Sequence, residues 1–203
     1  MSKGRVGVRL LVLAALAAAL AAPTSAAATD GDGLVGGCPY TYEQPFTPWL
    51  DFASYVLAPN GDLESGRAGW SLEDGASVVA ENESFYVHDA QDDKSLSLPA
   101  GSSATSDSMC IGVTSPDLRF FARNLGSPLS TLKVEVLYTD LLGRSRAVTV
   151  ALLTGSSSWQ PTLPVAVAAN LTLTTSVAFR FTPQGSSSEW RIDDVYVDPF
   201  KGE

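Results

Sequence analysis

Hydrophobic and polar residues alternate along several short stretches of the chain, which is the period of a strand with one buried face. In residues 131–139, the apolar positions Leu132, Val134, Val136 and Tyr138 alternate with Lys133, Glu135 and Thr139. In residues 176–182, Val177, Phe179 and Phe181 alternate with Ala178, Arg180 and Thr182. This pattern predicts half-buried antiparallel strands.

Clusters of Gly, Ser, Asn and Asp separate further segments that are rich in β-formers. We expect strands at 52–58, 69–73, 76–80, 94–98, 107–113, 117–123, 131–139, 145–153, 163–168, 176–182 and 189–197. Outside the N-terminal segment, no stretch keeps a helical period long enough to predict a helix. The sequence therefore predicts an all-β fold, an antiparallel β-sandwich of the jelly-roll type.

The last predicted strand contains WRIDDVYVDP at residues 190–199, with two adjacent acids in its middle. Since successive side chains of a strand face opposite sides, Asp193 or Asp194 should point into the packed interior, where an unpaired carboxylate is costly. Three roles are open for such an acid: a catalytic carboxylate, a metal ligand or a hydrogen-bond anchor of the fold.

Residues 1–28 have the pattern of a secretory signal peptide, with a basic start, the apolar run LLVLAALAAALAA and small residues before a polar segment. The apolar run is short for a membrane span. The Ala26-Ala27-Ala28 site favours cleavage, and an uncleaved anchor is the alternative. We therefore expect a secreted, extracellular protein that begins near Thr29 and has no membrane span in its mature form.

The mature chain is expected to contain an arm and one domain. Residues 29–50 are rich in Gly, Pro and aromatics and predict an irregular arm, while residues 51–200 predict the β-sandwich. Loss of the signal peptide leaves 10 basic against 22 acidic residues, so the formal charge moves from −9 to −12. Nucleic acid and anionic membranes bind clustered Lys and Arg, so we expect neither as a partner.

The two cysteines, Cys38 and Cys110, predict one disulfide, because an even number in an exported protein is typical of a structural bridge. This disulfide would tether the arm to the domain. A catalytic or metal-binding thiol is the weaker alternative, since the chain has a single histidine to pair with it.

The residue inventory argues against an enzyme. His88, the single histidine, lies in the polar stretch YVHDAQDD, where a solvated or structural role is expected. The chain has no G-x-S-x-G elbow before a helix and no H-E-x-x-H motif. A glycosidase pair such as Glu64 and Asp194 stays open, but an acidic chain offers such pairs by chance.

Two short motifs resemble the carbohydrate-binding modules of the galactose-binding-like jelly-roll fold. Those modules open with N-G-x-F-E-x-G, followed by G-W, and close on x-I-D-D-V-x-V. Here residues 60–66 are NGDLESG, Gly69-Trp70 follows, and residues 192–197 are IDDVYV. Leu63 replaces the usual Phe, and Trp159 resembles a tryptophan that begins a late strand. The whole chain also resembles secreted bacterial proteins of the same build, which share the cysteine-bearing arm.

The resemblance implies a structural calcium between the first and last strands. By position its ligands would be Glu64 and Asp194, with Asp62 and Asp193 as neighbours, because calcium takes oxygen ligands from carboxylates and carbonyls. In the alternative without a metal, Asp194 accepts backbone N–H bonds at a strand end and Asp193 pairs with Arg191 or Arg180.

A polysaccharide or a cell-surface glycan is the partner that the resemblance implies. Sugar binding needs exposed rings and polar groups beside them. The candidate rings are Trp70, Tyr86, Tyr138 and Trp159, and the candidate polar partners are Arg119, Arg123 and Arg180. For Tyr138 and Trp159 a place in the sandwich core is the stronger alternative.

Three functions follow, each with a structural criterion. A secreted, non-catalytic glycan-binding domain would show an exposed aromatic row on one sheet face. An extracellular structural or interaction protein would show a polar concave face with an apolar patch elsewhere. A small glycoside hydrolase would show two acids about 5–9 Å apart in a cleft.

Overall fold

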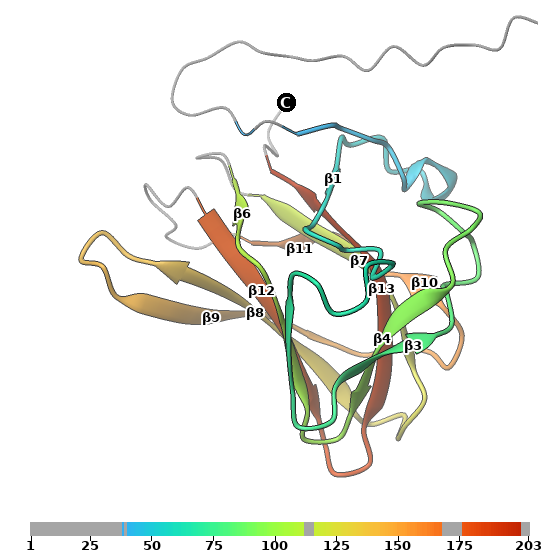
Figure 1. Ribbon diagram of the computed structural model, residues 1–203. Coiled ribbons are helices and arrows are strands. Elements are labelled where there is room, and N and C mark those ends of the chain that lie inside the picture. The colour runs from blue at the N-terminus through green and yellow to red at the C-terminus, as the bar shows by residue number, and fades with distance from the viewer. Residues whose placement is uncertain (1–37, 39, 112–115, 168–175, 200–203) are drawn as a thin grey trace, which may run out of the picture.

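The chain folds into two antiparallel β-sheets packed face to face, shown in Figure 1 as a computed structural model that describes residues 38, 40–111, 116–167 and 176–199. The strands are β1 (Val56–Leu57), β2 (Trp70–Glu73), β3 (Ser77–Ala80), β4 (Lys94–Pro99), β5 (Ser103–Ser106), β6 (Met109–Cys110), β7 (Asp117–Asn124), β8 (Thr131–Thr139), β9 (Ser145–Leu153), β10 (Gln160–Pro161), β11 (Val165–Ala166), β12 (Ser176–Gln184) and β13 (Glu189–Asp198). One 3₁₀ turn, η1 (Thr47–Trp49), precedes them. The predicted all-β sandwich is confirmed.

The first sheet contains both the first strand, β1, and the last strand, β13. The first sheet has the order β10-β7-β13-β4-β3, with β1 paired to β13 and β11 paired to β7. The second sheet has the order β2-β5-β12-β8-β9, with β6 paired to β12. The first and last strands therefore lie side by side, in antiparallel register between Val56 and Val197.

The strands with the clearest alternation lie where the sequence predicts them, since β8 covers residues 131–139 and β12 begins at Ser176. The described parts of the expected strands 52–58, 107–113 and 163–168 form only the two-residue strands β1, β6 and β11, and Tyr55 adds an isolated bridge to Glu43. The sequence did not predict β5 or β10. The predicted signal peptide lies outside the described residues.

The main core fills the space between the sheets with the inward residues of both. On β12 these are Val177, Phe179 and Phe181, each fully buried, and on β13 they include Trp190 and Ile192. Burial of each such side chain contributes roughly 1.5–3 kcal/mol. The period-two pattern thus supplies most of the apolar surface that holds the sandwich together.

A second, smaller core lies on the outer face of the first sheet, beneath the arm. Its buried rings are Phe46, Tyr55, Phe121, Trp159 and Tyr196. Phe46, from the arm, packs at 5.7 Å between ring centroids on Phe121 of β7. Tyr55 and Glu43 pair their backbones, so the arm folds back over the sheet edge.

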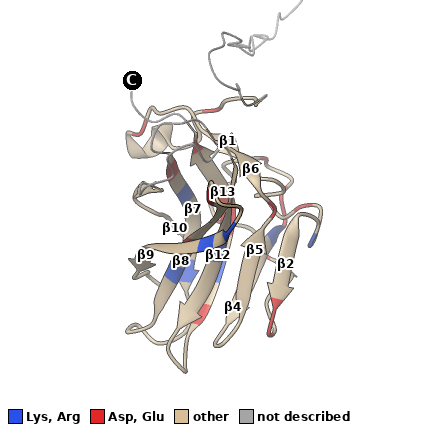
Figure 2. Cartoon of the chain, turned by 90° about the vertical axis from the view of Figure 1, so that its left-hand side faces the viewer, with Lys and Arg blue, Asp and Glu red and all other residues tan. Residues whose placement is uncertain are grey.

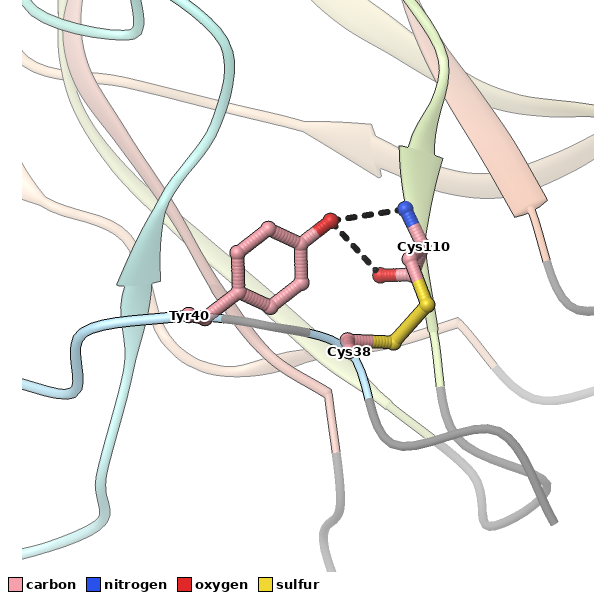
Figure 3. Close-up of a disulfide and its surroundings, with 3 residues drawn as sticks. All are labelled: Cys38, Tyr40 and Cys110. Atoms are coloured by element: carbon pink, nitrogen blue, oxygen red, sulfur yellow. Dashed lines mark hydrogen bonds between the residues drawn. A yellow bond between two sulfur atoms is a disulfide. The ribbon is translucent and has the colours of Figure 1, made fainter. Parts of the chain in front are cut away.

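The predicted disulfide is confirmed and joins Cys38 of the arm to Cys110 of β6 (Figure 3). Tyr40 strengthens the same junction, since its hydroxyl accepts the Cys110 N–H at 2.7 Å and donates to the Cys110 carbonyl at 3.2 Å. Among the described residues, no helix has the length and apolar character needed to cross a membrane.

Candidate functional site

The closing strand β13 is interrupted by a β-bulge at its pair of acids. Asp193 lies opposite Phe121, but Tyr196 lies opposite Arg119, so β13 carries one extra residue here. Asp194 has φ of 46°, in the left-handed region that Asp tolerates better than most residues. The bulge explains how two adjacent side chains can both be buried in one strand.

The opening motif meets this bulge through its backbone. Val195 donates its N–H to the Gly61 carbonyl at 3.0 Å, and Ala58 donates to the Val195 carbonyl at 2.8 Å. A Cβ at Gly61 would lie 2.6 Å from that Val195 oxygen, so the position requires glycine. The N-G turn and the closing aspartates are therefore one structural unit.

Asp193 is a hydrogen-bond anchor. Its two oxygens accept the N–H groups of Glu83 at 2.8 Å and of Asp194 at 2.9 Å. Burial, followed by the neighbouring charge of Asp194, raises the pKa of Asp193. Asp193 thus holds the connection between β3 and β4, residues 81–93, against β13.

The metal-free alternative expected Asp193 to pair with Arg191 or Arg180. Neither arginine is its partner in the structure. Arg191 donates to Ser97 at 2.6 Å and lies beside Glu189, and Arg180 donates to Glu135 at 2.9 Å.

Glu83, a residue that the sequence did not predict to be structural, holds the next turn of that connection. Its side chain is fully buried, and its carboxylate accepts the N–H of Phe85 at 2.5 Å and of Val87 at 2.7 Å. Burial is the largest cause of the raised pKa of Glu83. An acid ahead of S-F-Y is the only sequence signal for this role, and it is a weak one.

Asp194 faces a small polar group built from His88, Asp92 and Asp62. His88 Nδ1 lies 2.8 Å from an Asp92 oxygen and 3.6 Å from an Asp62 oxygen. One potential ligand atom from each of His88, Asp92 and Asp194 lies within 4.8 Å of the others. Asp194 is 1% exposed, and neither of its oxygens makes a hydrogen bond, although the backbone N–H of His88 faces them.

The charges in this group act on each other. Burial, followed by the charge of Glu83, raises the pKa of Asp194 to about 7. Burial alone would lower the pKa of His88, but Asp92 and Asp62 outweigh it and raise that pKa. His88 is thus the one basic side chain beside three carboxylates, those of Asp62, Asp92 and Asp194, in this group.

The predicted calcium ligand Glu64 is held away from this group. One oxygen of its carboxylate accepts the N–H groups of Asp93 and Lys94 at 2.9 and 2.8 Å, and the other pairs with the Lys94 ammonium at 3.0 Å. Asp194 belongs to the cluster of potential ligand atoms and Asp62 lies 3.6 Å from His88, but Glu64 already has its partners. Calcium binding stays a prediction, and the available donors differ from the predicted set.

Trp70 does not form the exposed sugar platform that the sequence suggested. It is 5% exposed, its ring packs on Phe181, and its Nε1 donates to the Asn60 carbonyl at 2.8 Å. As the first residue of β2, Trp70 faces the core and closes it beside the opening turn. Trp159 is also buried, and Tyr138 packs against the main core.

The three candidate arginines are engaged in ion pairs. Arg119 is buried, pairs with Asp51 at 2.5 Å and lies 4.1 Å above the Phe46 ring. Arg123 pairs with Glu81 and lies 5.3 Å from the Trp159 ring. Arg180 pairs with Glu135 at 2.9 Å. Arg119 thus links the sheet to Phe46 of the arm, and all three guanidinium groups are already paired with a carboxylate.

Tyr86, the remaining predicted ring, is exposed. It is 52% exposed, and its neighbour Phe85 is 43% exposed. The Trp49 ring of η1 packs edge-on against Phe85, with 5.0 Å between ring centroids. We refer to Trp49, Phe85 and Tyr86 as the aromatic edge.

The outer face of the second sheet is polar where β8 and β12 pair, and Leu152 of β9 is exposed beside it. Lys133, Glu135 and Arg180 form a linked set on β8 and β12, where Figure 2 shows the Lys and Arg side by side. The aromatic rings that stand out as exposed in the described part of the chain are Phe52, Phe85 and Tyr86, all outside the strands. The expected aromatic row on a sheet face is therefore absent from the described residues.

The comparison with known proteins identifies a fold and no family. No family model matches the chain, and no curated protein matches it. The structure is similar to that of the CBM22-1 and GH10 modules of Clostridium thermocellum xylanase Xyn10B complexed with xylohexaose, with a TM-score of 0.52 and 16% identity, over 68% of this chain and 27% of that one.

A second similar structure is the CBM22-1–CBM22-2 tandem of Paenibacillus barcinonensis Xyn10C, with a TM-score of 0.52 and 16% identity, over 74% of this chain and 46% of that one. The chain thus spans less than half the length of either protein. It has the jelly-roll fold of carbohydrate-binding modules, as the motifs at its two ends suggested.

Proposed function

We propose that this protein is a secreted, non-catalytic domain that binds a polysaccharide or cell-surface glycan through the aromatic edge. The observation that carries the proposal is the way the two most exposed rings of this edge are held. Phe85 and Tyr86 lie on a turn whose N–H groups are bound by the buried Glu83, which is itself bound to Asp193. Rings held rigidly at a surface can stack on sugars at low entropic cost.

The acid pair that the sequence left open for hydrolysis, Glu64 and Asp194, is not available to a substrate. Glu64 is bound by Lys94 and by two backbone N–H groups, and Asp194 is buried. A retaining or inverting mechanism needs two acids presented to the scissile bond. We therefore infer binding without catalysis.

Affinity electrophoresis of the purified chain in gels that contain soluble polysaccharides, xylan first, tests the proposal. Retardation by one glycan should disappear in Tyr86→Ala and persist in Phe52→Ala, which removes an exposed ring outside the aromatic edge. Unchanged mobility of the wild-type protein across the panel would exclude a glycan from the aromatic edge.

One observation favours a second function, an interaction with another protein outside the cell. The polar face of the second sheet lies near exposed leucines at the turn between β8 and β9, Leu141 and Leu142. This combination is the one expected of a domain without a sugar site. Unchanged mobility in the gels would favour this function.

A further inference from the structure

The connection at 81–93, which carries Phe85 and Tyr86, packs against β13, and a group of buried acids lies where the two meet. Glu83, Asp92, Asp193 and Asp194 are all buried, and His88 is the one basic side chain paired within the group. Glu83 and Asp193 are neutralised in part by two N–H donors each, and Asp92 by His88. The backbone N–H of His88 faces Asp194, but neither Asp194 oxygen makes a hydrogen bond.

An unpaired buried carboxylate costs free energy that a fold does not retain without a compensating interaction. Asp194 is also held in a left-handed backbone conformation at a bulge, which adds a local cost. One of its oxygens lies within 4.8 Å of a potential ligand atom of His88 and of Asp92. A cation between the three side chains would supply the missing partner.

The donor set decides which cation fits. Calcium prefers oxygen ligands throughout, whereas an imidazole nitrogen combined with carboxylates suits zinc and similar transition metals. With bonds of about 2.0 Å, two zinc ligands in a tetrahedral site lie about 3.3 Å apart. His88 Nδ1 and the Asp92 oxygen lie 2.8 Å apart and need only a small separation to admit the ion.

We propose that His88, Asp92 and Asp194 bind a divalent transition metal of the zinc class, with Asp62 beside them as a further oxygen donor. This site replaces the calcium site implied by the sequence, because Glu64 is committed to Lys94 and an imidazole takes its place. The ion would join the opening turn, the connection at 81–93 and β13. The site is independent of whether the aromatic edge binds a glycan.

Thermal unfolding of the EDTA-treated full chain with zinc chloride or calcium chloride tests the site. At about 100 times its Kd, zinc should raise the Tm by roughly 5–10 °C, because binding to the folded state alone stabilises it. His88→Gln and Asp194→Asn should both lose this shift. The matched control Asp93→Asn removes an exposed acid of the same connection and should retain the shift.

Asp194→Asn is nearly isosteric and removes an unpaired charge, so without metal it should be as stable as the wild type. Cobalt(II) gives a direct readout, since a visible absorption band should form in the wild type and be absent from His88→Gln. A Tm shift with calcium and none with zinc would overturn the proposal in favour of an all-oxygen site. No shift with either metal, or equal zinc shifts in all variants, would also overturn it.

Discussion

At the scale of single residues, two adjacent aspartates have opposite environments. Asp193 binds two backbone N–H groups and holds a loop in place, whereas Asp194 is buried without a hydrogen bond. The bulge creates the difference, because it turns one side chain toward the loop backbone and the other toward His88.

Asp193→Leu should lower the free energy of unfolding by about 1–3 kcal/mol or more. The substitution leaves the buried Glu83 N–H without its acceptor, so the connection at 81–93 loses its anchor. Urea denaturation followed by tryptophan fluorescence measures the change, with Asp194→Asn as the control. Equal stability of Asp193→Leu and the wild type would show that the anchor is dispensable.

The ion pair between Asp51 and Arg119 should make the attachment of the arm sensitive to acid. Burial raises the pKa of Asp51, but the Ala53 N–H, the Tyr55 hydroxyl and Arg119 together hold it below its ordinary value of 3.8. Since the folded-state pKa lies below the unfolded value, the stabilisation is fully present above pH 3.8. It is lost as the pH falls through the folded-state value.

Below pH 3.8, the stability of the wild type should therefore fall more steeply than that of Asp51→Asn. Denaturation midpoints measured from pH 6 down to about pH 2 test this window. Parallel curves for the two proteins would mean that the Asp51–Arg119 pair contributes nothing to acid stability.

At the scale of elements, the long strands could be located from alternation in the sequence. The short strands form because neighbouring strands pair with them. The strands β8 and β12 could be predicted because their own residues alternate. Residues 103–106, SATS, carry no such pattern, and they form β5 because β2 and β12 lie on either side. The same reason explains β10, a two-residue pairing with β7.

The candidate site was predictable only in part. The D-D pair and the N-G turn identified where the ends of the chain meet, but no local pattern reveals a bulge or its φ. His88 and Asp92 lie about 100 residues before Asp194, and only the fold brings them together. Trp70 was misassigned because a lone Trp at a strand start gives no indication of which face it occupies.

Gly61→Ala should destabilise the junction of the first and last strands by about 1–3 kcal/mol. The added methyl would overlap the Val195 carbonyl at 2.6 Å, and neither backbone can move without losing the two hydrogen bonds between them. Gly66→Ala is the control for backbone conformation, since Gly66 has φ of 65° and open space around its Cα. A smaller loss in Gly61→Ala than in Gly66→Ala would contradict the close approach.

At the scale of the whole molecule, the arm closes the outer face of the first sheet. Phe46 and Trp49 cover Phe121, and the aromatic edge exists only because η1 lies against Phe85. In its described part, the arm pairs its backbone through the Glu43–Tyr55 bridge and is attached further by the packing of its side chains and by the disulfide. Figure 1 shows it as an irregular segment ahead of β1.

The disulfide therefore sets the stability of both the arm and the proposed binding surface. It closes a loop of 72 residues, and in the chain-entropy model such a loop contributes about 4 kcal/mol by restricting the unfolded chain. The double variant Cys38→Ser/Cys110→Ser should lose about this amount in urea denaturation. Tyr40→Phe, which removes only the hydroxyl bonds to Cys110, should lose about 1 kcal/mol. If the two variants lost the same amount, the junction would be held by Tyr40 and not by the covalent link.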